Sequence, residues 1–236
     1  MKLASVLFMA AIASPAAAGR SLVVLDPGHG GSNSGARGAV SGLYEKQLTL
    51  ALAEQVATQL RGHGIAVELT RDDDRTLTLR QRVARADALD ADLFISIHCN
   101  ASPTRTQHGY ETYVLTTKGV DVDGRALRAD VVTPRPGVDR ETALVLDDVE
   151  RGASQWEAAD LAERIQHALR ERRGDAGDRG VRQDSHHVLL GATMPAVLVE
   201  VGFIDHPVEG RELADPAVQA QLASALAEAI EDQLAD

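Results

Sequence analysis

The chain has 236 residues, a formal net charge of −11 and a single cysteine. This length is enough for one α/β domain with a sizeable core, although two small domains would also fit it. The acidic balance without a basic patch argues against nucleic acid or an anionic membrane as the ligand, and the lone Cys99 excludes an intramolecular disulfide.

The first 18 residues have the pattern of a secretory signal peptide. Lys2 supplies a positive charge, residues 3–13 are apolar, and the small residues 16–18 form an A-x-A cleavage site. The apolar run is shorter than the roughly 20 residues that cross a bilayer, and an uncleaved anchor is the alternative. We predict a signal peptide over 1–18, a folded part over 19–236, no membrane span after cleavage, and a periplasmic or secreted location.

The first half of the folded part alternates apolar strands with amphipathic helices. Apolar residues recur every four positions after Glu45, which predicts a helix with one core-facing stripe. Thr78 is suited to cap a second helix. The expected elements are strands over residues 22–25, 65–69, 93–98 and 110–115, and helices over about 45–62 and 79–88.

The second half begins with a long irregular stretch. Residues 116–153 contain several glycines and prolines among many charges, and are too numerous for an ordinary connection. The stretch is either an excursion with a function or a tolerated surface insertion. Ser154-Gln155-Trp156-Glu157 then has capping-box spacing, which predicts a helix that ends at Gly174. Further expected elements are strands over residues 188–190 and 196–201 and a last helix that begins at Asp215-Pro216.

The alternation of strands and helices predicts an α/β fold. We expect a single open sheet, mainly parallel or mixed, which helices cover on both faces. In open α/β sheets, ligands and catalytic groups collect at the carboxyl ends of the strands. Side chains that follow strands are therefore the first candidates for a functional site.

Three such side chains are potential metal ligands. His29 follows the first strand within a glycine-rich loop, Glu45 begins the first helix, and His98 ends a later strand. Two histidines and one carboxylate suit Zn²⁺ and leave a fourth position for water. Taken singly, His29 is equally well explained as a turn histidine and His98 as a core histidine. Spacing alone does not join the three residues.

A further carboxylate, Glu200, lies within an otherwise apolar strand. An unpaired buried carboxylate is costly, so Glu200 must face a charge, a hydrogen-bonding group or an open site. One interpretation is a general base that acts on a metal-activated water. The other is a strand-end glutamate that pairs with an arginine such as Arg71 or Arg179.

Seven motifs follow one another along the folded part: residues 24–31 (VLDPGHGG), 44–46 (YEK), 70–71 (TR), 92–101 (DLFISIHCNA), 179–181 (RGV), 188–189 (VL) and 194–203 (MPAVLVEVGF). Together and in this order, they resemble the zinc-dependent N-acetylmuramoyl-L-alanine amidases that trim the bacterial cell wall, in particular AmiC-type catalytic domains. The resemblance covers nearly the whole folded part.

The resemblance implies one Zn²⁺ ion on His29, Glu45 and His98, with Glu200 as the catalytic carboxylate. It implies that residues 19–236 form a catalytic domain that hydrolyses the amide bond between N-acetylmuramic acid and L-alanine in peptidoglycan, for wall remodelling or daughter-cell separation. Peptidoglycan is the expected partner and a monomer the expected state. The alternatives are a zinc peptidase that acts within the stem peptide and a non-catalytic peptidoglycan-binding module.

The resemblance also suggests regulation. Residues 116–153 fall where division-associated members place a helix that blocks the zinc site until an activator protein displaces it. Residues 141–150 resemble that neighbourhood, and a carboxylate there is a candidate for the open zinc position. Short insertions in related enzymes need no partner, so the tolerated insertion remains the alternative.

Three further residues lie near the expected site. Cys99 stands where the family usually has a small residue such as alanine, and we expect it to pack in the core rather than bind metal. His186 and His187 precede an expected strand that approaches the site in the family fold. They are either substrate contacts or a solvent-facing pair.

Overall fold

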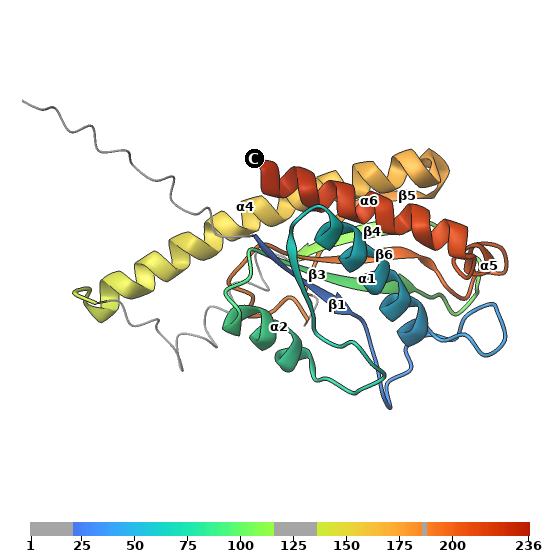
Figure 1. Cartoon of the computed structure of the whole chain (residues 1–236), viewed down its shortest axis with the longest axis horizontal. Coiled ribbons are helices and arrows are strands. Elements are labelled where there is room, and N and C mark those ends of the chain that lie inside the picture. The colour runs from blue at the N-terminus through green and yellow to red at the C-terminus, as the bar shows by residue number, and fades with distance from the viewer. Residues whose placement is uncertain (1–20, 116–135, 186–187) are drawn as a thin grey trace, which may run out of the picture.

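A computed structural model describes residues 21–115, 136–185 and 188–236 (Figure 1). The predicted signal peptide, residues 116–135 of the long insertion, and the pair His186 and His187 lie outside these described residues. No helix of the described part combines the length and the apolar character that a membrane crossing requires.

The described part contains one six-stranded mixed sheet in the order β2-β1-β3-β6-β4-β5. Only β4 and β6 pair antiparallel; the other neighbouring strands are parallel. The strands are β1 (Leu22–Pro27), β2 (Ala66–Leu69), β3 (Leu93–Asn100), β4 (Tyr110–Leu115), β5 (Asp178–Asp184) and β6 (Ala196–Phe203). The helices are α1 (Glu45–Gly62), α2 (Leu79–Ala88), α4 (Arg140–Arg173), α5 (Glu209–Glu212) and α6 (Pro216–Ala235). The expected single mixed sheet is confirmed.

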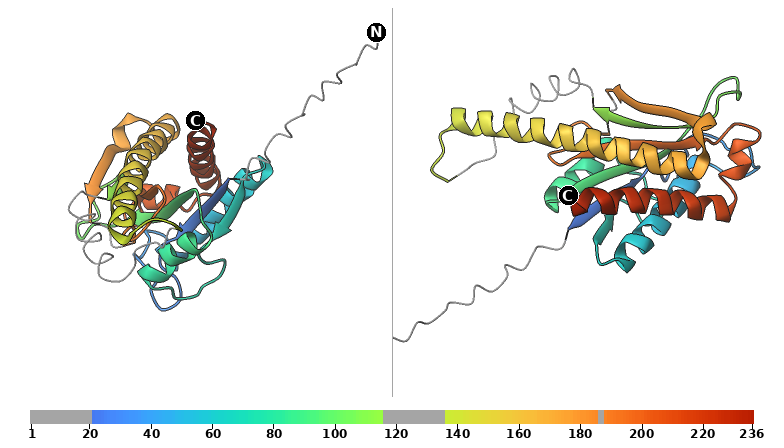
Figure 2. Two further views of the ribbon diagram at one scale, coloured as in Figure 1. Left: turned by 90° about the vertical axis from the view of Figure 1, so that its left-hand side faces the viewer. Right: turned by 90° about the horizontal axis from the view of Figure 1, so that it is seen from above.

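Helices cover both faces of this sheet, but unequally (Figures 1 and 2). Helices α1, α4 and α6 pack on one face and bury the larger apolar cluster, which includes Ile95, Leu161 and Leu226. Helix α2 and the turn around Leu189 cover part of the other face, where Phe94 belongs to a smaller cluster. The prediction of helices on both faces is therefore confirmed, with one thick and one thin layer.

Side-chain alternation along the strands divides the thin face into two halves. In β3, Ile95, Ile97 and Cys99 point to the three-helix face, so Phe94, Ser96 and His98 point to the α2 face. The residues on this face are apolar near the amino ends of the parallel strands and polar near the carboxyl ends. The polar half of this face is therefore where a functional site can form.

Helices α1 and α2 begin where the sequence predicts, at Glu45 and after the cap Thr78. The Gln47 side chain accepts a hydrogen bond from the Tyr44 backbone amide (2.8 Å) at the start of α1. The Thr78 hydroxyl accepts one from the Gln81 amide at the start of α2. The core-facing stripe of α1, which was expected from its four-residue repeat, is confirmed by the burial of Leu48, Leu52, Val56 and Leu60.

Helix α4 begins earlier than its sequence suggests. The predicted start at Ser154 is wrong, because Asp139 caps the helix by accepting a hydrogen bond from the Thr142 amide (2.9 Å). The helix then continues through Gly152, whose cost of about 1 kcal/mol relative to alanine is tolerated. The Ser154 hydroxyl instead donates to the Thr193 carbonyl. The amino-terminal half of α4 extends beyond the sheet (Figures 1 and 2).

The expected strand over residues 188–190 is also wrong. Val188 and Leu189 lie in a turn, although both are buried in the smaller apolar cluster. A short apolar run marks burial without specifying a strand, which explains the error. The strand of this region is β5, a polar segment without apolar alternation that pairs only with β4 at the edge of the sheet.

A buried ionic cluster lies on the polar half of the α2 face of the sheet, beneath the loop that follows β1. Both Asp26 and Arg82 are almost fully buried and pair through Oδ1 and Nη1 at 2.7 Å. Asp26 also accepts hydrogen bonds from the Thr70 and Ser96 hydroxyls. Arg82 further donates to the carbonyls of Pro27 and His29, so one ion pair anchors the start of the glycine-rich loop.

We predict that Asp26→Ala destabilises the fold by about 3–5 kcal/mol, because it leaves the buried Arg82 guanidinium without a counter-charge. Glu68→Ala is the matched control, since it removes an exposed pair with Arg85 and should cost at most about 1 kcal/mol. Urea unfolding of the three proteins measures the difference. Equal stability of the two variants would contradict the structural role of the cluster.

Candidate metal centre

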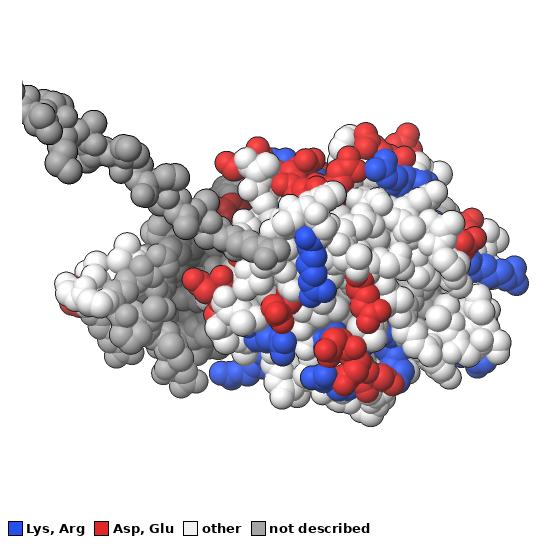
Figure 3. Space-filling model, viewed as in Figure 1, with Lys and Arg blue, Asp and Glu red and all other residues white. Residues whose placement is uncertain are grey.

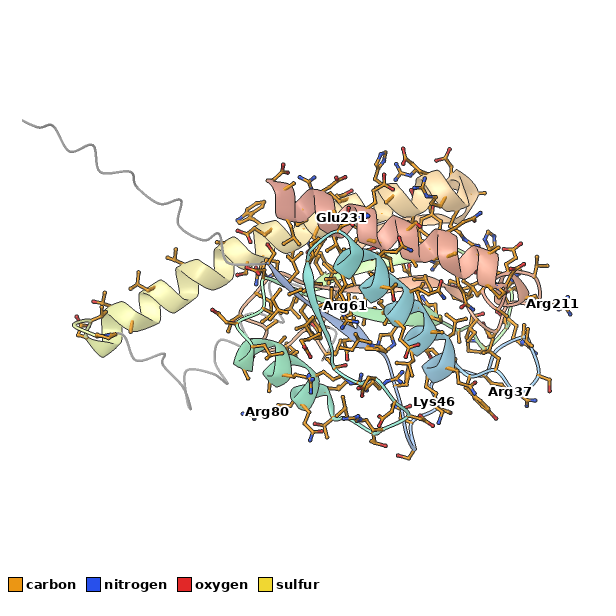
Figure 4. All side chains as sticks on the ribbon, in the orientation of Figure 1. Arg37, Lys46, Arg61, Arg80, Arg211 and Glu231 are labelled. Carbon is orange, nitrogen blue, oxygen red and sulfur yellow. The ribbon has the colours of Figure 1, made fainter. Side chains whose placement is uncertain are left out.

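The structure brings His29, Glu45 and His98 together at the carboxyl ends of β1 and β3. His29 Nε2 lies 2.9 Å from Glu45 Oε1, and His98 Nδ1 lies 3.1 Å from the same oxygen. One ligand atom from each residue lies within 4.8 Å of the other two. Lys46, the residue after Glu45, marks this end of α1 in Figure 4, away from the projecting end of α4.

Backbone and side-chain contacts fix the orientation of the three side chains. Asn33 Oδ1 lies 3.0 Å from His29 Nδ1, which leaves Nε2 to face Glu45. The amide of Cys99 donates to Glu45 Oε1 and the amide of Ala36 donates to Oε2. Such second contacts set the tautomer and direction of metal-binding side chains. The centre is therefore held in place by the loops that surround it.

Glycine is required at two positions where the backbone approaches the side chains of the centre. A Cβ atom on Gly28 would lie 2.4 Å from His98 Cε1, and one on Gly35 would lie 2.6 Å from Glu45 Oε2. His29 itself has φ of 62°, a left-handed conformation that non-glycine residues seldom adopt. The Arg82 guanidinium, which donates to the His29 carbonyl, helps to hold this turn.

The electrostatics of the centre favour a charged carboxylate. Burial would raise the pKa of Glu45, but hydrogen bonds from His29 and His98 hold it well below its usual range. Burial would lower the pKa of His29, and the contact with Glu45 outweighs this and raises it. About one fifth of each histidine side chain is exposed (21% and 19%), so the centre is reachable from solvent.

This donor set fits a divalent metal ion. Two imidazole nitrogens and one carboxylate oxygen converge, which is the ligand chemistry that Zn²⁺ prefers. The neighbouring Cys99 is not part of the set, because alternation along β3 points it into the three-helix core, as expected. Burial and nearby carboxylates, Glu45 first among them, raise the pKa of its thiol well above the usual value.

Glu200 lies beside the centre on the next strand. In the β3–β6 register it stands opposite His98, and in the β6–β4 register it stands opposite Glu111. Its Oε2 atom is buried and has no hydrogen-bond partner in the described part of the chain. Burial, together with repulsion from Glu45 and Glu111, raises its pKa well above the usual value.

The alternative of an ion pair between Glu200 and an arginine is wrong for both candidates. Arg71 donates to backbone carbonyls that include those of Pro27 and Gly28. Arg179 pairs with Glu111 instead, at 2.9 Å. Glu200 is thus a half-buried residue with a buried Oε2 atom and no cationic partner among the described residues.

Sequence reasoning missed Glu111. This residue is 2% exposed and lies on β4 among Tyr110, Thr112 and Tyr113. Glu200 stands out as a carboxylate in an otherwise apolar strand, whereas Tyr and Thr residues flank Glu111, so the same signal is absent there. Its partners are Arg179 (2.9 Å), Arg182 (2.6 Å), Asn100 (2.5 Å) and Tyr113 (3.0 Å).

Comparison with known proteins agrees with this arrangement. A family model described as N-acetylmuramoyl-L-alanine amidase matches residues 23–232. The amidase AmiA of Escherichia coli K12 is 34% identical over 220 residues, which cover 90% of this chain and 75% of AmiA. Among solved structures, AmiC2 of Nostoc punctiforme has 30% identity and a TM-score of 0.70, with 92% of this chain and 99% of that chain covered.

The catalytic domain of CwlV from Paenibacillus polymyxa var. colistinus is similar too, with 31% identity, a TM-score of 0.64, and coverage of 91% of this chain and 98% of that one. These matches extend over nearly the whole described part and confirm the resemblance that the sequence motifs indicated. The chain belongs to the N-acetylmuramoyl-L-alanine amidase family.

Proposed function

We propose that this amidase is zinc-dependent and cleaves the bond between N-acetylmuramic acid and L-alanine in peptidoglycan. The observation that supports this most strongly is the convergence of His29, Glu45 and His98, with Glu200 in register beside His98. A set of two histidines and a carboxylate leaves room for solvent on the metal, as a hydrolase requires.

In this proposal His29 Nε2, Glu45 Oε1 and His98 Nδ1 hold one Zn²⁺ ion. When bound, the ion supplies Lewis-acid chemistry that activates water and polarises the scissile carbonyl. Asn33 keeps the His29 ring in the tautomer that presents Nε2. The Cys99 and Ala36 amides fix the Glu45 carboxylate and leave little freedom for it to swing away.

Glu200 is proposed to move the proton. Its Oε2 has no competing partner among the described residues, and no described arginine neutralises it, so the carboxylate has a high proton affinity. It can therefore accept a proton from the attacking water and return one to the leaving amine. In the β3–β6 register Glu200 stands opposite His98, one strand from the proposed metal ligands, which supports this role.

The first test concerns the metal. Purified wild-type protein is expected to contain about one zinc ion per chain, because the donor set is complete in one chain. Gly28→Ala should lose most of it, since the new methyl group would overlap the His98 ring. Gly62→Ala, at a position with nothing within 4 Å, should bind zinc like the wild type. Elemental analysis after dialysis measures all three, and normal zinc content in Gly28→Ala would contradict the assigned geometry.

The second test concerns the reaction. Glu200→Gln should keep the zinc ion but lose at least about 100-fold in turnover, because the amide cannot take up a proton. Mass spectrometry of digested cell walls identifies the bond that is cut. Glycan freed from intact stem peptides supports the amidase, whereas shortened peptides support the alternative zinc peptidase. Wild-type digestion by Glu200→Gln would remove this residue from the mechanism.

Location and wider role are proposed from the sequence. The predicted signal peptide over residues 1–18 supports export to the periplasm or beyond, where peptidoglycan, the proposed partner, is found. The role in wall remodelling or daughter-cell separation and the monomeric state are likewise proposed from the sequence resemblance.

The charged side chains are dispersed on the face of the molecule drawn in Figure 3. The described residues on this face form no broad basic patch.

Autoinhibition through residues 116–153 stays a prediction. The described part of this segment forms the start of α4, which lies at the end of the molecule opposite the first turn of α1 (Figures 1 and 2). In this arrangement the helix backbone over residues 140–150 does not approach the metal centre. A block of the centre by this described part of the segment would thus require a rearrangement of α4.

Deletion of residues 134–150 tests the regulatory role. If the segment blocks the centre, basal hydrolysis of labelled cell walls should rise, because the competing carboxylates are removed. Circular dichroism and zinc content serve as controls for folding. Unchanged or lower activity in a folded variant would count against self-blocking.

A further inference from the structure

Two arginines share one buried carboxylate beside Glu200. The Glu111 Oε2 atom accepts a hydrogen bond from Arg179 Nε at 2.9 Å and lies 2.6 Å from Arg182 Nε in a second ion pair. One carboxylate faces two guanidinium groups, so the cluster has a surplus of one positive charge. In a chain with net charge −11, this surplus stands next to the proposed catalytic carboxylate.

The two arginines are not equivalent. Arg179 is 28% exposed at its side chain and lies over the Phe203 ring, 5.0 Å from the centroid, which makes it part of the packed structure. Arg182 is 46% exposed, and its terminal amino groups have no hydrogen-bond partner among the described residues. Its Nε lies against Glu111 Oε2 and the side chain is half exposed, so Arg182 presents a cationic fork to solvent.

The position of this fork relative to the centre follows from the sheet. Alternation places His98, Glu200 and Glu111 on the same sheet face, on the neighbouring strands β3, β6 and β4. Adjacent strands are about 4.8 Å apart, and the arginines of β5 reach back to Glu111. Their guanidinium groups thus lie roughly 5–10 Å from the Glu200 position, which is one or two residues of an extended peptide.

We propose that Arg182 binds a carboxylate of the stem peptide on the leaving side of the scissile amide. This inference rests on the proposed function and names a determinant of its substrate specificity. In peptidoglycan the residue after L-alanine is a glutamate linked through its γ-carboxyl, whose α-carboxyl is either free or amidated. A free carboxylate there would balance the surplus charge of the Glu111 cluster, and a bidentate guanidinium is suited to hold it.

The competing explanation is purely structural. The cluster also ties β5 to β4, so Arg182 would then serve only to secure an edge strand. The two explanations differ in one measurable respect. A substrate contact discriminates between a carboxylate and a carboxamide at the same position, whereas a structural contact affects both substrates equally.

The experiment uses the zinc-loaded full chain and two muramyl peptides that differ only in a free or amidated glutamate α-carboxyl. The wild type should prefer the free acid by about tenfold in kcat/KM, chiefly through KM, as expected for one charge-assisted contact at a partly exposed site. Arg182→Gln should abolish this preference by losing activity on the acid alone, and Arg182→Lys should retain part of it. Arg85→Gln is the control, because Arg85 is similarly exposed (45%) and pairs with Glu68 at the far edge of the sheet.

Several outcomes would overturn the assignment. A wild type that cuts both substrates equally well lacks the contact, and an Arg182→Gln variant that keeps the preference places the contact elsewhere. An equal loss on both substrates would establish the structural explanation. If the wild type releases L-alanyl peptide from neither substrate, the proposed amidase reaction itself fails, which is a distinct result.

Discussion

The buried carboxylate of Glu45 is the contact on which the centre depends. It is the first residue of α1, it is 4% exposed, and it meets the loop after β1 and the end of β3 at one point. A buried charge is tolerated only when hydrogen bonds and opposite charges surround it. The His29 and His98 rings and the amides of Ala36 and Cys99 provide that surrounding, so three distant segments converge on one oxygen pair.

Most of the sheet could be predicted from the sequence because apolar runs and caps are local signals. The strands β1, β3, β4 and β6 and the starts of α1 and α2 lie where these signals place them. The start of α4 could not be predicted, because Gly152 inside the helix is a residue that usually indicates a loop. The edge strand β5 could not be predicted, because it has no apolar alternation. Their form depends on contacts with other segments, such as the pairing of β5 with β4.

The centre shows the same division between local and distant information. His29, Glu45, His98 and Glu200 are recognisable by residue type and motif, but their distances follow only from the parallel register of β1, β3 and β6. Glu111 escaped notice because its charged partners, Arg179 and Arg182, lie on another strand far along the chain. The Glu111 cluster explains why Glu200 lacks a cation: the arginine expected to neutralise it is already engaged one strand away.

The inward orientation of Cys99 has a consequence for the reactivity of its thiol toward oxidants. Thiol–disulfide exchange requires an accessible thiolate, and this sulfur is buried at 3% residue exposure with its pKa raised. Copies of the protein should therefore not become crosslinked through their one sulfhydryl, and small-molecule disulfides should leave it unmodified. A chain without any disulfide of its own can thus tolerate a cysteine one residue from a metal ligand.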